Sequence, residues 1–206
     1  MRTNGAYSVL GDPPLVGMIG RKRAGKDTFA GVLSTEAAFT RVAFADPLRD
    51  VALELNPIVG TFALTPEGAF GPSVREWRLR DVVETIGWER AKDYVPEVRL
   101  TGLQGLGQAI RTLDPDFWLR IALGRIEAAP GAVVVTDVRL PNEAAAIVAL
   151  GGVLVRVVRP GQVDDGDTHT TETALDDYEV DFEVLNDGTV SDLEDRARAF
   201  LATFLY

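Results

Sequence analysis

The sequence has no cysteine and a single histidine among its 206 residues. The lack of cysteine excludes disulfide bonds and thiolate metal sites, and one histidine alone does not make a structural zinc site. No run of about 18 uncharged apolar residues occurs, so we expect no transmembrane helix. The N-terminal segment also lacks the long apolar centre of a signal peptide. These absences predict a soluble cytoplasmic protein with no membrane partner.

A surplus of basic residues is missing too, because 31 acidic residues outweigh 21 lysines and arginines and give a formal net charge of −10. Proteins that bind nucleic acid usually carry a basic balance or stripe, so we expect no nucleic-acid partner. Lysine is scarce and occurs only as Lys22, Lys26 and Lys92. A lysine retained at position 26 is therefore more informative than any one of the arginines.

Short apolar runs alternate with helical patterns along the chain. This alternation predicts an α/β fold with three layers, in which helices cover both faces of a parallel sheet. We expect a single domain over residues 1–206, because the length and the 46% of hydrophobic residues suit one continuous core. The predicted strands lie near residues 15–19, 41–44, 132–136, 153–158 and 182–185. The predicted helices cover residues 26–38, 46–55, 74–94, 101–113, 114–128, 141–150 and 191–204.

Residues 56–128 interrupt this alternation with a mainly helical insertion, which we expect to act as a lid or to bind the acceptor. Its first part, residues 56–73, is rich in glycine and proline. We expect a long connection there, because long connections in compact domains are often lids or binding loops. The predicted helices that begin at residues 46 and 114 both open with Asp-Pro, and this pattern predicts Asp46 as the N-cap of its helix. A capping box at Ser191 and Glu194 is expected to open the last helix.

The segment at residues 20–28 (GRKRAGKDT) follows the first predicted strand and precedes a helix. Its Gly20-x4-Gly25-Lys26 spacing is that of a Walker A loop, in which backbone N–H groups around Ala24 converge on phosphate oxygens. Lys26 is expected to reach the β and γ phosphates of ATP. The usual next residue is Ser or Thr, but here it is Asp27, with Thr28 one place later. Either Asp27 approaches Mg²⁺ through water, or Thr28 supplies the hydroxyl ligand.

A second cluster, residues 137–143 (DVRLPNE), follows the most apolar predicted strand. Ligands of open α/β sheets bind beyond the carboxyl ends of the strands, where Asp137 falls. An aspartate there can hold Mg²⁺ directly or through water. Arg139 and Glu143 follow closely, so two carboxylates and a guanidinium are expected together at this edge of the sheet. The plainer alternative is a helix start with a surface ion pair and a solvated Glu143.

Taken together, these motifs resemble the deoxynucleoside monophosphate kinases of tailed bacteriophages. The matching segments are residues 20–28, 44–50 (FADPLRD), 103–111 (LQGLGQAIR), 114–118 (DPDFW), 136–147, 169–172 (HTTE) and 185–188 (LNDG). The resemblance implies that ATP phosphorylates a deoxynucleoside monophosphate with Mg²⁺ as cofactor. It implies a P-loop kinase fold, in the host cytoplasm if a phage encodes the protein. It also implies that Asp27, Thr28, Trp118, Asp137, Arg139 and Glu143 lie in the active site.

Individual roles follow from the chemistry of each side chain. Lys26, Asp137 and Arg139 are the predicted catalytic residues, since phosphoryl transfer depends on charge stabilisation and a guanidinium fork matches phosphate oxygens. For Asn186 and Gly188 the prediction comes from the resemblance, since the loop at this place in related kinases packs beside the ATP adenine, although a plain turn would use the same residues. The predicted acceptor-binding residues are Asp46, Gln104, Arg111, Trp118, Arg139 and Glu143.

Several alternatives stay open at this point. Trp118 can be a core residue, Arg111 a solvated one, and His169 a loop residue that pairs with Glu172. Arg75, Arg120 and Arg125 are weaker candidates for phosphate binding. The function can also be that of another small-molecule kinase, such as one resembling dephospho-coenzyme A kinase, or of a P-loop ATPase or regulator. The accepted bases and the choice between monomer and homodimer cannot be derived from the sequence.

Overall fold

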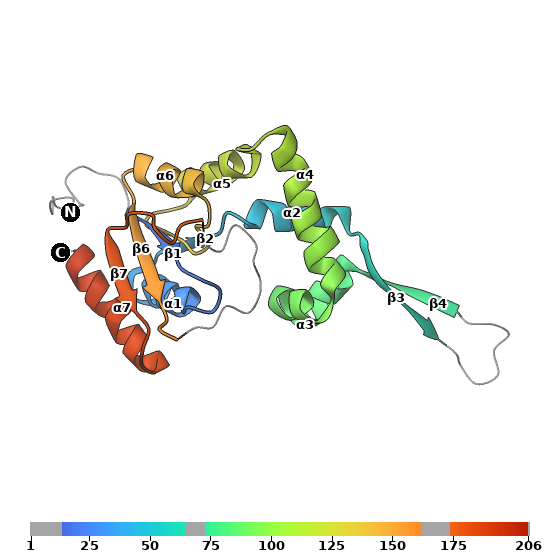
Figure 1. Cartoon of the computed structure of the whole chain (residues 1–206), viewed down its shortest axis with the longest axis horizontal. Helices are drawn as coiled ribbons and strands as arrows, with labels where there is room; N and C mark the ends of the chain where they lie inside the picture. Colours follow the sequence, from blue (N-terminus) through green and yellow to red (C-terminus); the bar gives the residue numbers. More distant parts are fainter. Residues whose placement is uncertain (1–13, 65–72, 162–173, 206) are drawn as a thin grey trace. The chain divides into compact units, whose positions relative to one another are not determined.

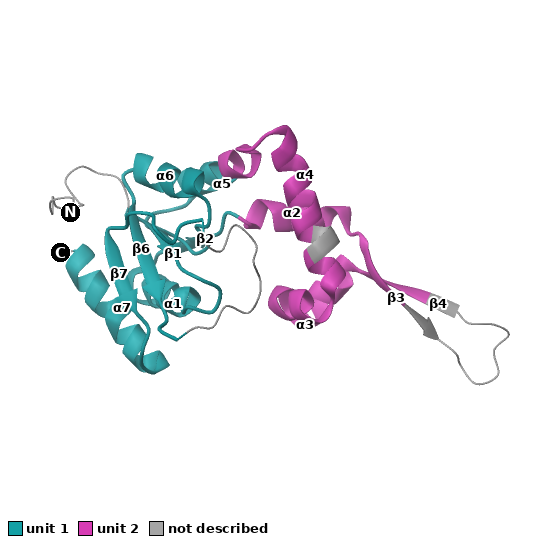
Figure 2. Cartoon of the chain, in the orientation of Figure 1, with its two compact units in different colours: residues 1–44, 122–206 teal, residues 45–121 magenta. Residues whose placement is uncertain are grey.

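The computed structural model describes residues 14–64, 73–161 and 174–205. The chain divides into two compact units, one formed by residues 1–44 and 122–206 and the other by residues 45–121 (Figure 2). His169 and Glu172, for which a loop pairing was one alternative, lie outside the described residues. No helix in the described ranges is long and apolar enough to cross a membrane.

The first unit is built on a five-stranded parallel sheet (Figure 1). Its spatial order is β2-β5-β1-β6-β7, and each neighbouring pair is parallel. The strands are β1 (Leu15–Ile19), β2 (Thr40–Val42), β5 (Val133–Val135), β6 (Val153–Val158) and β7 (Phe182–Leu185). This sheet confirms the predicted α/β fold class, and β1, β6 and β7 have the predicted bounds.

The second strand ends earlier than predicted. The last contact of β2 with its neighbour is at Val42, whose carbonyl accepts a hydrogen bond from the N–H of Thr136, and the chain then leaves the sheet. The N–H of Phe44 donates to the carboxylate of Asp137 at 2.6 Å instead of to a neighbouring strand. The hydrogen bond from the Phe44 N–H to the Asp137 side chain thus takes the place of the last hydrogen bond that the predicted strand would make to its neighbour.

Helices lie on both faces of this sheet. α1 (Lys26–Ala37) and α7 (Val190–Phe204) share one hydrophobic cluster with the strands, in which Phe29 and Phe200 pack at 5.6 Å between ring centroids. α6 (Pro141–Ala149) covers the other face, where a Cβ on Gly17 would come within 3.2 Å of Ile147. The central strands β1, β5 and β6 are therefore buried on both faces, as their apolar composition requires.

The second unit has a small core of its own. It contains α2 (Asp46–Leu55), β3 (Ile58–Leu64), β4 (Ser73–Arg78), α3 (Leu79–Tyr94), the π-helix η1 (Val98–Gly105) and α4 (Leu106–Leu113). The helix α5 (Phe117–Ala128) begins in this unit and ends in the other. Ala52, Val59, Leu79 and Val98 are among the buried residues that pack together here.

The prediction for residues 56–73 was wrong in its described part. β3 and β4 form an antiparallel ladder there, with Thr61 paired to Glu76 and Gly60 to Trp77. The helix predicted from residue 74 begins only at Leu79, because residues 73–78 belong to β4. Gly60 inside β3 and Pro57 directly before it hid the strand pattern, since both residue types are depleted in strands.

Several predicted helix starts were displaced. The N-cap of α2 is Ala45, with Asp46 as the first helical residue. The C-terminal helix is capped by Thr189, whose Oγ1 accepts from the N–H of Asp192 at 3.2 Å, while the Asp192 carboxylate accepts from the N–H of Thr189 at 2.7 Å. The predicted box at Ser191 and Glu194 was wrong by two residues, because Thr and Asp have the same spacing and fulfil the same roles.

Candidate active site

The phosphate turn lies between β1 and α1, as predicted. Gly20 and Gly25 adopt φ angles of +145° and +107°, a region that glycine reaches without strain. The Lys26 ammonium folds back over the turn, where Nζ donates to the carbonyls of Gly20 at 2.5 Å and Arg21 at 2.8 Å. The positive charge of Lys26 and the N-terminal end of α1 therefore meet at one turn, which is the arrangement that binds phosphate.

The loop after β7 supports this turn from behind. The side-chain amide of Asn186 donates to the carbonyl of Ala24 at 2.8 Å. A Cβ on Gly25 would lie 2.7 Å from that amide nitrogen and 2.6 Å from Leu193 Cδ2. A Cβ on Gly188 would lie 2.5 Å from the carboxylate of Asp192, the partner of the cap of α7. Asn186 thus has a structural contact that supports the phosphate turn, whereas Gly188 leaves room for the cap of α7. Contact of either residue with ATP stays a prediction.

The residues after β5 form the second wall of the site. Asp137 accepts the N–H of Phe44, and the N–H of Val138 donates to the carbonyl of Met18 in β1 at 3.2 Å. Glu143 is buried, and its Oε2 accepts from the N–H groups of Arg139 at 2.8 Å and Leu140 at 3.0 Å. The plainer alternative of a solvated Glu143 was therefore wrong. This carboxylate fixes the backbone from which the Arg139 side chain projects.

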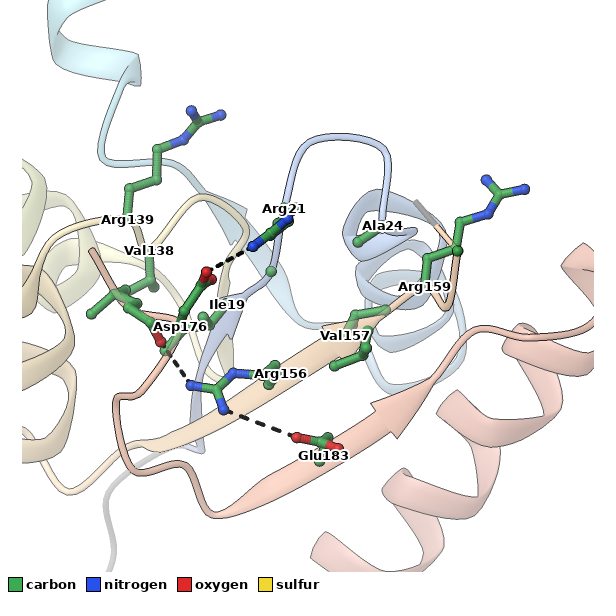
Figure 3. Close-up of a pocket in the computed structure, with 14 residues that line it drawn as sticks. Ile19, Arg21, Ala24, Val138, Arg139, Arg156, Val157, Arg159, Asp176 and Glu183 are labelled. Carbon is green, nitrogen blue, oxygen red and sulfur yellow. Dashed lines mark hydrogen bonds and ion pairs between the residues drawn. The ribbon is translucent and has the colours of Figure 1, made fainter. Parts of the chain in front are cut away.

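A pocket of about 410 Å³ opens beside the turn, within the first unit (Figure 3). Gly20 and Ala24 line it from the turn and Arg139 from the loop after β5. Its charged lining residues are Arg21, Arg139, Arg156, Arg159, Asp176 and Glu183. Of the predicted site residues, the lining includes Gly20, Ala24 and Arg139 and not Lys26, Asp27, Thr28, Asp137, Glu143, Asn186 or Gly188.

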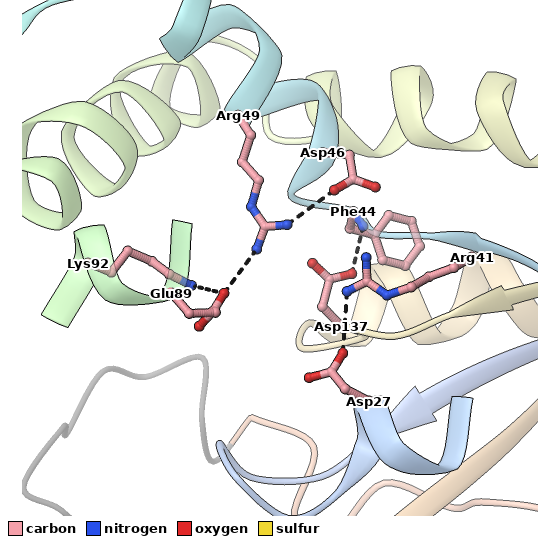
Figure 4. A network of polar contacts seen from close by, with 8 residues as sticks. All are labelled: Asp27, Arg41, Phe44, Asp46, Arg49, Glu89, Lys92 and Asp137. Atoms are coloured by element: carbon pink, nitrogen blue, oxygen red, sulfur yellow. Dashed lines mark hydrogen bonds and ion pairs between the residues drawn. The ribbon is translucent and has the colours of Figure 1, made fainter. Parts of the chain in front are cut away.

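The predicted Mg²⁺ ligands are all oxygen donors of this unit. Asp27 is exposed and its Oδ1 lies 3.3 Å from Arg41 Nη2, while Thr28 is half-buried in the first turn of α1 (Figure 4). Asp137 lies at the end of β5 with one oxygen on the N–H of Phe44. Carboxylate and hydroxyl oxygens suit Mg²⁺, which takes further ligands from water and substrate phosphates. This donor set fits an ion that arrives with the nucleotide.

A polar cluster in the second unit surrounds Arg49, which was not singled out from the sequence. Arg49 Nη1 lies 3.2 Å from Asp46 Oδ1, and Nη2 lies 4.0 Å from Glu89 Oε1 (Figure 4). Lys92 Nζ bonds the same Glu89 oxygen at 2.7 Å, and the ring centroid of Trp88 is 6.0 Å from Arg49 Cζ. Arg49 Nε is buried, and no residue in the described ranges accepts a hydrogen bond from it. The guanidinium is thus held between two carboxylates while this buried N–H has no acceptor among the described residues.

Other predicted acceptor residues also lie in the second unit. Trp118 is only 4% exposed, and its indole N–H donates to the carbonyl of Gly107 at 3.2 Å, which ties α5 to α4. A Cβ on Gly107 would lie 3.6 Å from Arg111 Nη1, so this guanidinium lies beside α4. Gln104 is half-buried in η1. The hydrogen bond and burial explain Trp118 structurally, and a role of Trp118, Arg111 or Gln104 in acceptor binding stays a prediction.

The weaker arginine candidates differ in their surroundings. Arg120 pairs with Asp114, and the hydrogen bond from this guanidinium holds the pKa of Asp114 below its usual value. Arg120 is therefore engaged at the start of α5. Arg75 is exposed on β4, and Arg125 is half-buried in α5.

Two arginines that the structure brings forward carried signals in the sequence. Arg49 belongs to the FADPLRD segment, in which only Asp46 was considered. Arg156 is the one charged residue in the β6 run VLVRVV. A charge inside a buried strand needs a partner, so this position was the clearer signal.

The fold and the turn define the class of protein. A parallel sheet whose first strand enters a glycine turn, with a lysine folded over it and a helix behind, is a P-loop nucleotide-binding fold. A family model described as deoxynucleotide monophosphate kinase matches residues 97–197. A protein of Acanthamoeba polyphaga mimivirus, named provisionally as a deoxynucleotide monophosphate kinase, is 32% identical over 170 residues, covering 78% of this chain and 81% of the viral protein. The chain belongs to the deoxynucleotide monophosphate kinase family, which confirms the predicted family.

More distant similarities were also found. The deoxynucleotide monophosphate kinase of Enterobacteria phage T4 is 28% identical over 143 residues, which cover 67% of this chain and 57% of the phage protein. Among solved structures, shikimate kinase from Aquifex aeolicus is 12% identical with a TM-score of 0.47, covering 92% of this chain and 96% of its own. Dephospho-CoA kinase from Campylobacter jejuni is 14% identical with a TM-score of 0.42 and the same coverage of this chain, 92%. Both TM-scores lie below 0.5, so the family assignment rests on the viral relative.

Proposed function

We propose that the protein transfers the γ-phosphoryl group of MgATP to a deoxynucleoside monophosphate, giving ADP and a deoxynucleoside diphosphate for DNA synthesis. Family membership supports this acceptor class. The observation that supports the donor site most directly is the Lys26 ammonium, which bonds the carbonyls of Gly20 and Arg21 across the turn. The positive charge therefore already lies at the turn that would hold the β and γ phosphates.

Charge stabilisation is the main demand of phosphoryl transfer. Lys26 neutralises the triphosphate, and Arg139 extends from the loop after β5 toward the transferred group or the acceptor phosphate. Asp137, Asp27 and Thr28 would hold the metal ion of MgATP, directly or through water, and such an ion would supply further charge neutralisation to the triphosphate. Glu143 keeps the Arg139 backbone in place through two N–H contacts.

For the acceptor, we add Arg49 to the predicted residues Asp46, Gln104, Arg111 and Trp118. Arg49 is fixed by Asp46 and Glu89, and its buried Nε has no hydrogen-bond acceptor within the described part of the chain. An unsatisfied buried donor is costly, and an anionic oxygen would satisfy it with a charge-assisted bond. The acceptor phosphate is the ligand of this site that carries such oxygens.

A panel of acceptors tests the function. Purified protein is incubated with ATP, Mg²⁺ and each deoxy- or ribonucleoside monophosphate, and the diphosphates are separated and quantified. We expect diphosphate from at least one deoxynucleotide. The Lys26→Ala variant should turn over roughly 100-fold more slowly or worse, because it loses transition-state charge stabilisation, with an unchanged circular dichroism spectrum.

The rival functions give different outcomes in the same panel. If no deoxynucleotide yields a diphosphate, the proposal is wrong. Phosphorylation of dephospho-coenzyme A alone would identify another small-molecule kinase. ATP hydrolysis that no monophosphate alters would identify an ATPase or regulator. Sedimentation of the active protein decides between the monomer and homodimer that the sequence left open.

A further inference from the structure

We propose that Arg21 is a further phosphate-binding residue of the donor site, that Asp176 restrains it when no nucleotide is bound, and that Arg156 positions Asp176. The nucleotide phosphate then exchanges with the Asp176 carboxylate on the Arg21 guanidinium. This inference rests on the proposed function only in requiring that the turn binds a nucleoside triphosphate.

The ion pair between Arg21 and Asp176 crosses the pocket beside the turn. Arg21 Nη2 lies 2.8 Å from Asp176 Oδ2, and both residues line the pocket with Gly20 and Ala24 (Figure 3). Arg21 belongs to the phosphate turn itself, whereas Asp176 comes from the segment before β7. The carboxylate thus occupies one guanidinium face at the place where phosphate oxygens are expected.

Arg156 holds the segment that carries Asp176. Its Nη2 donates to the carbonyls of Leu175 at 2.8 Å and Tyr178 at 2.6 Å, and its Nη1 lies 3.9 Å from Glu183 Oε2 (Figure 3). The Arg156 side chain is only 18% exposed. A charge buried in an apolar strand is tolerated when its donors are paired, and here they pair with the backbone on both sides of Asp176. The position of the carboxylate is therefore set by β6.

The exposure of the pair favours exchange over a permanent bridge. The two side chains are 44% and 43% exposed, and ion pairs at such exposure contribute little stability. A phosphate competes well for the same guanidinium, because it accepts two parallel hydrogen bonds and carries more charge. A carboxylate that lines a phosphate pocket also repels the ligand. Removing it should therefore tighten nucleotide binding, which is the opposite of what damage to a binding site would cause.

The decisive measurement is the Kd of MgATP by isothermal titration for the wild type, Asp176→Asn, Arg21→Gln and the double variant. We expect a Kd several-fold lower for Asp176→Asn and several-fold higher for Arg21→Gln. In the double variant the gain should vanish, because no guanidinium is left to be released. Asp177→Asn is the matched control, since it removes an exposed carboxylate from the same turn, and its Kd should stay within twofold of the wild type.

Arg156→Lys tests the positioning role. This variant keeps the charge but cannot bridge both carbonyls, so Asp176→Asn should change the Kd less in its background than in the wild type. A fold defect alone would lower the melting temperature without removing that response. An equal response in both backgrounds overturns the role of Arg156.

Three results would overturn the exchange itself. Asp176→Asn could weaken or leave unchanged the binding of MgATP, Asp177→Asn could tighten it equally, or the double variant could keep the full gain. A wild type that phosphorylates deoxynucleotides while Asp176→Asn leaves the Kd unchanged refutes only this inference. A wild type that binds no ATP refutes the proposed function as well.

Discussion

Replacement of Gly20 by alanine is the sharpest test of the turn as the structure describes it. A Cβ on Gly20 would lie 2.5 Å from the carbonyl oxygen of Val157 and 3.4 Å from its carbonyl carbon. Both atoms belong to the backbone of β6, which is paired to β1 and β7 and cannot rotate away as a side chain could. The φ of +145° at Gly20 adds a conformation that alanine avoids.

Two terms set the size of the effect. Overpacking against a fixed group costs about 1–3 kcal/mol, and an alanine forced to positive φ adds roughly 1 kcal/mol or more. Gly20→Ala should therefore destabilise the protein by roughly 2–4 kcal/mol. For a chain of this length each kcal/mol corresponds to about 2–4 °C, so we expect a melting temperature lower by roughly 4–16 °C. The displaced turn should also weaken ATP binding.

Gly31→Ala is the matched control. Gly31 lies inside α1, and a Cβ there meets nothing within 4 Å. Alanine in a helix interior is favoured over glycine by about 0.5–1 kcal/mol, so this variant should gain stability. Urea titration and calorimetry measure both changes. If Gly20→Ala lies within about 0.5 kcal/mol of the wild type, a range usual for harmless surface changes, the close approach to Val157 is refuted.

Three further variants test the site and its frame. Arg139→Ala should lower kcat/KM by roughly 100-fold in steady-state assays, because it removes a charge that acts on the transferred phosphoryl group. A higher KM with an unchanged kcat would contradict a transition-state role. Arg49→Met should raise the KM of the monophosphate by about tenfold or more and leave the KM of ATP unchanged. The KM of the monophosphate for Arg49→Lys should lie between those of the wild type and Arg49→Met. Equal changes in the KM values of ATP and the monophosphate would contradict a role of Arg49 in acceptor binding. Thr189→Ala should cost about 0.5–2 kcal/mol of stability at neutral pH by urea titration, because it removes an N-cap. The backbone N–H of Thr189 and, after it, the Thr189 hydroxyl hold the pKa of Asp192 below its ordinary value. The ionised carboxylate therefore stabilises the fold above about pH 4 and loses this contribution as the pH falls further. Thr189→Ala removes only the hydroxyl, so the difference in stability between variant and wild type should shrink in acid by the share of the hydroxyl alone.

Local patterns predicted the framework of the first unit well. β1 and β6 are short, mostly apolar runs bounded by turn residues, and burial on both faces leaves such runs few other structures. β7 alternates half-buried and exposed residues instead, as a strand with one covered face does. The phosphate turn was predictable for a similar reason, because its glycines are needed for backbone angles that the structure then adopts at Gly20 and Gly25. In each case the determining interaction lies within a few residues of the chain.

What the sequence failed to predict depends on partners far along the chain. β3 is a strand because β4 pairs with it, and neither shows the alternation of a half-buried strand on its own. The surroundings of Arg49 are likewise non-local, since Trp88 and Glu89 come from another helix. No spacing in the sequence indicates that these groups meet.

Motif-based prediction also assigned to ligands some residues that the fold uses itself. Glu143 accepts two backbone N–H groups beside Arg139, and Asn186 holds the carbonyl of Ala24 in the phosphate turn. Arg156 does the same for the segment that carries Asp176. These half-buried or buried polar groups set the backbone direction, while the more exposed Arg21 and Arg139 extend from that backbone into the pocket. A residue of a sequence motif can therefore be required for the shape of a loop alone. Only measurements that separate protein stability from nucleotide affinity show whether such a residue binds the ligand.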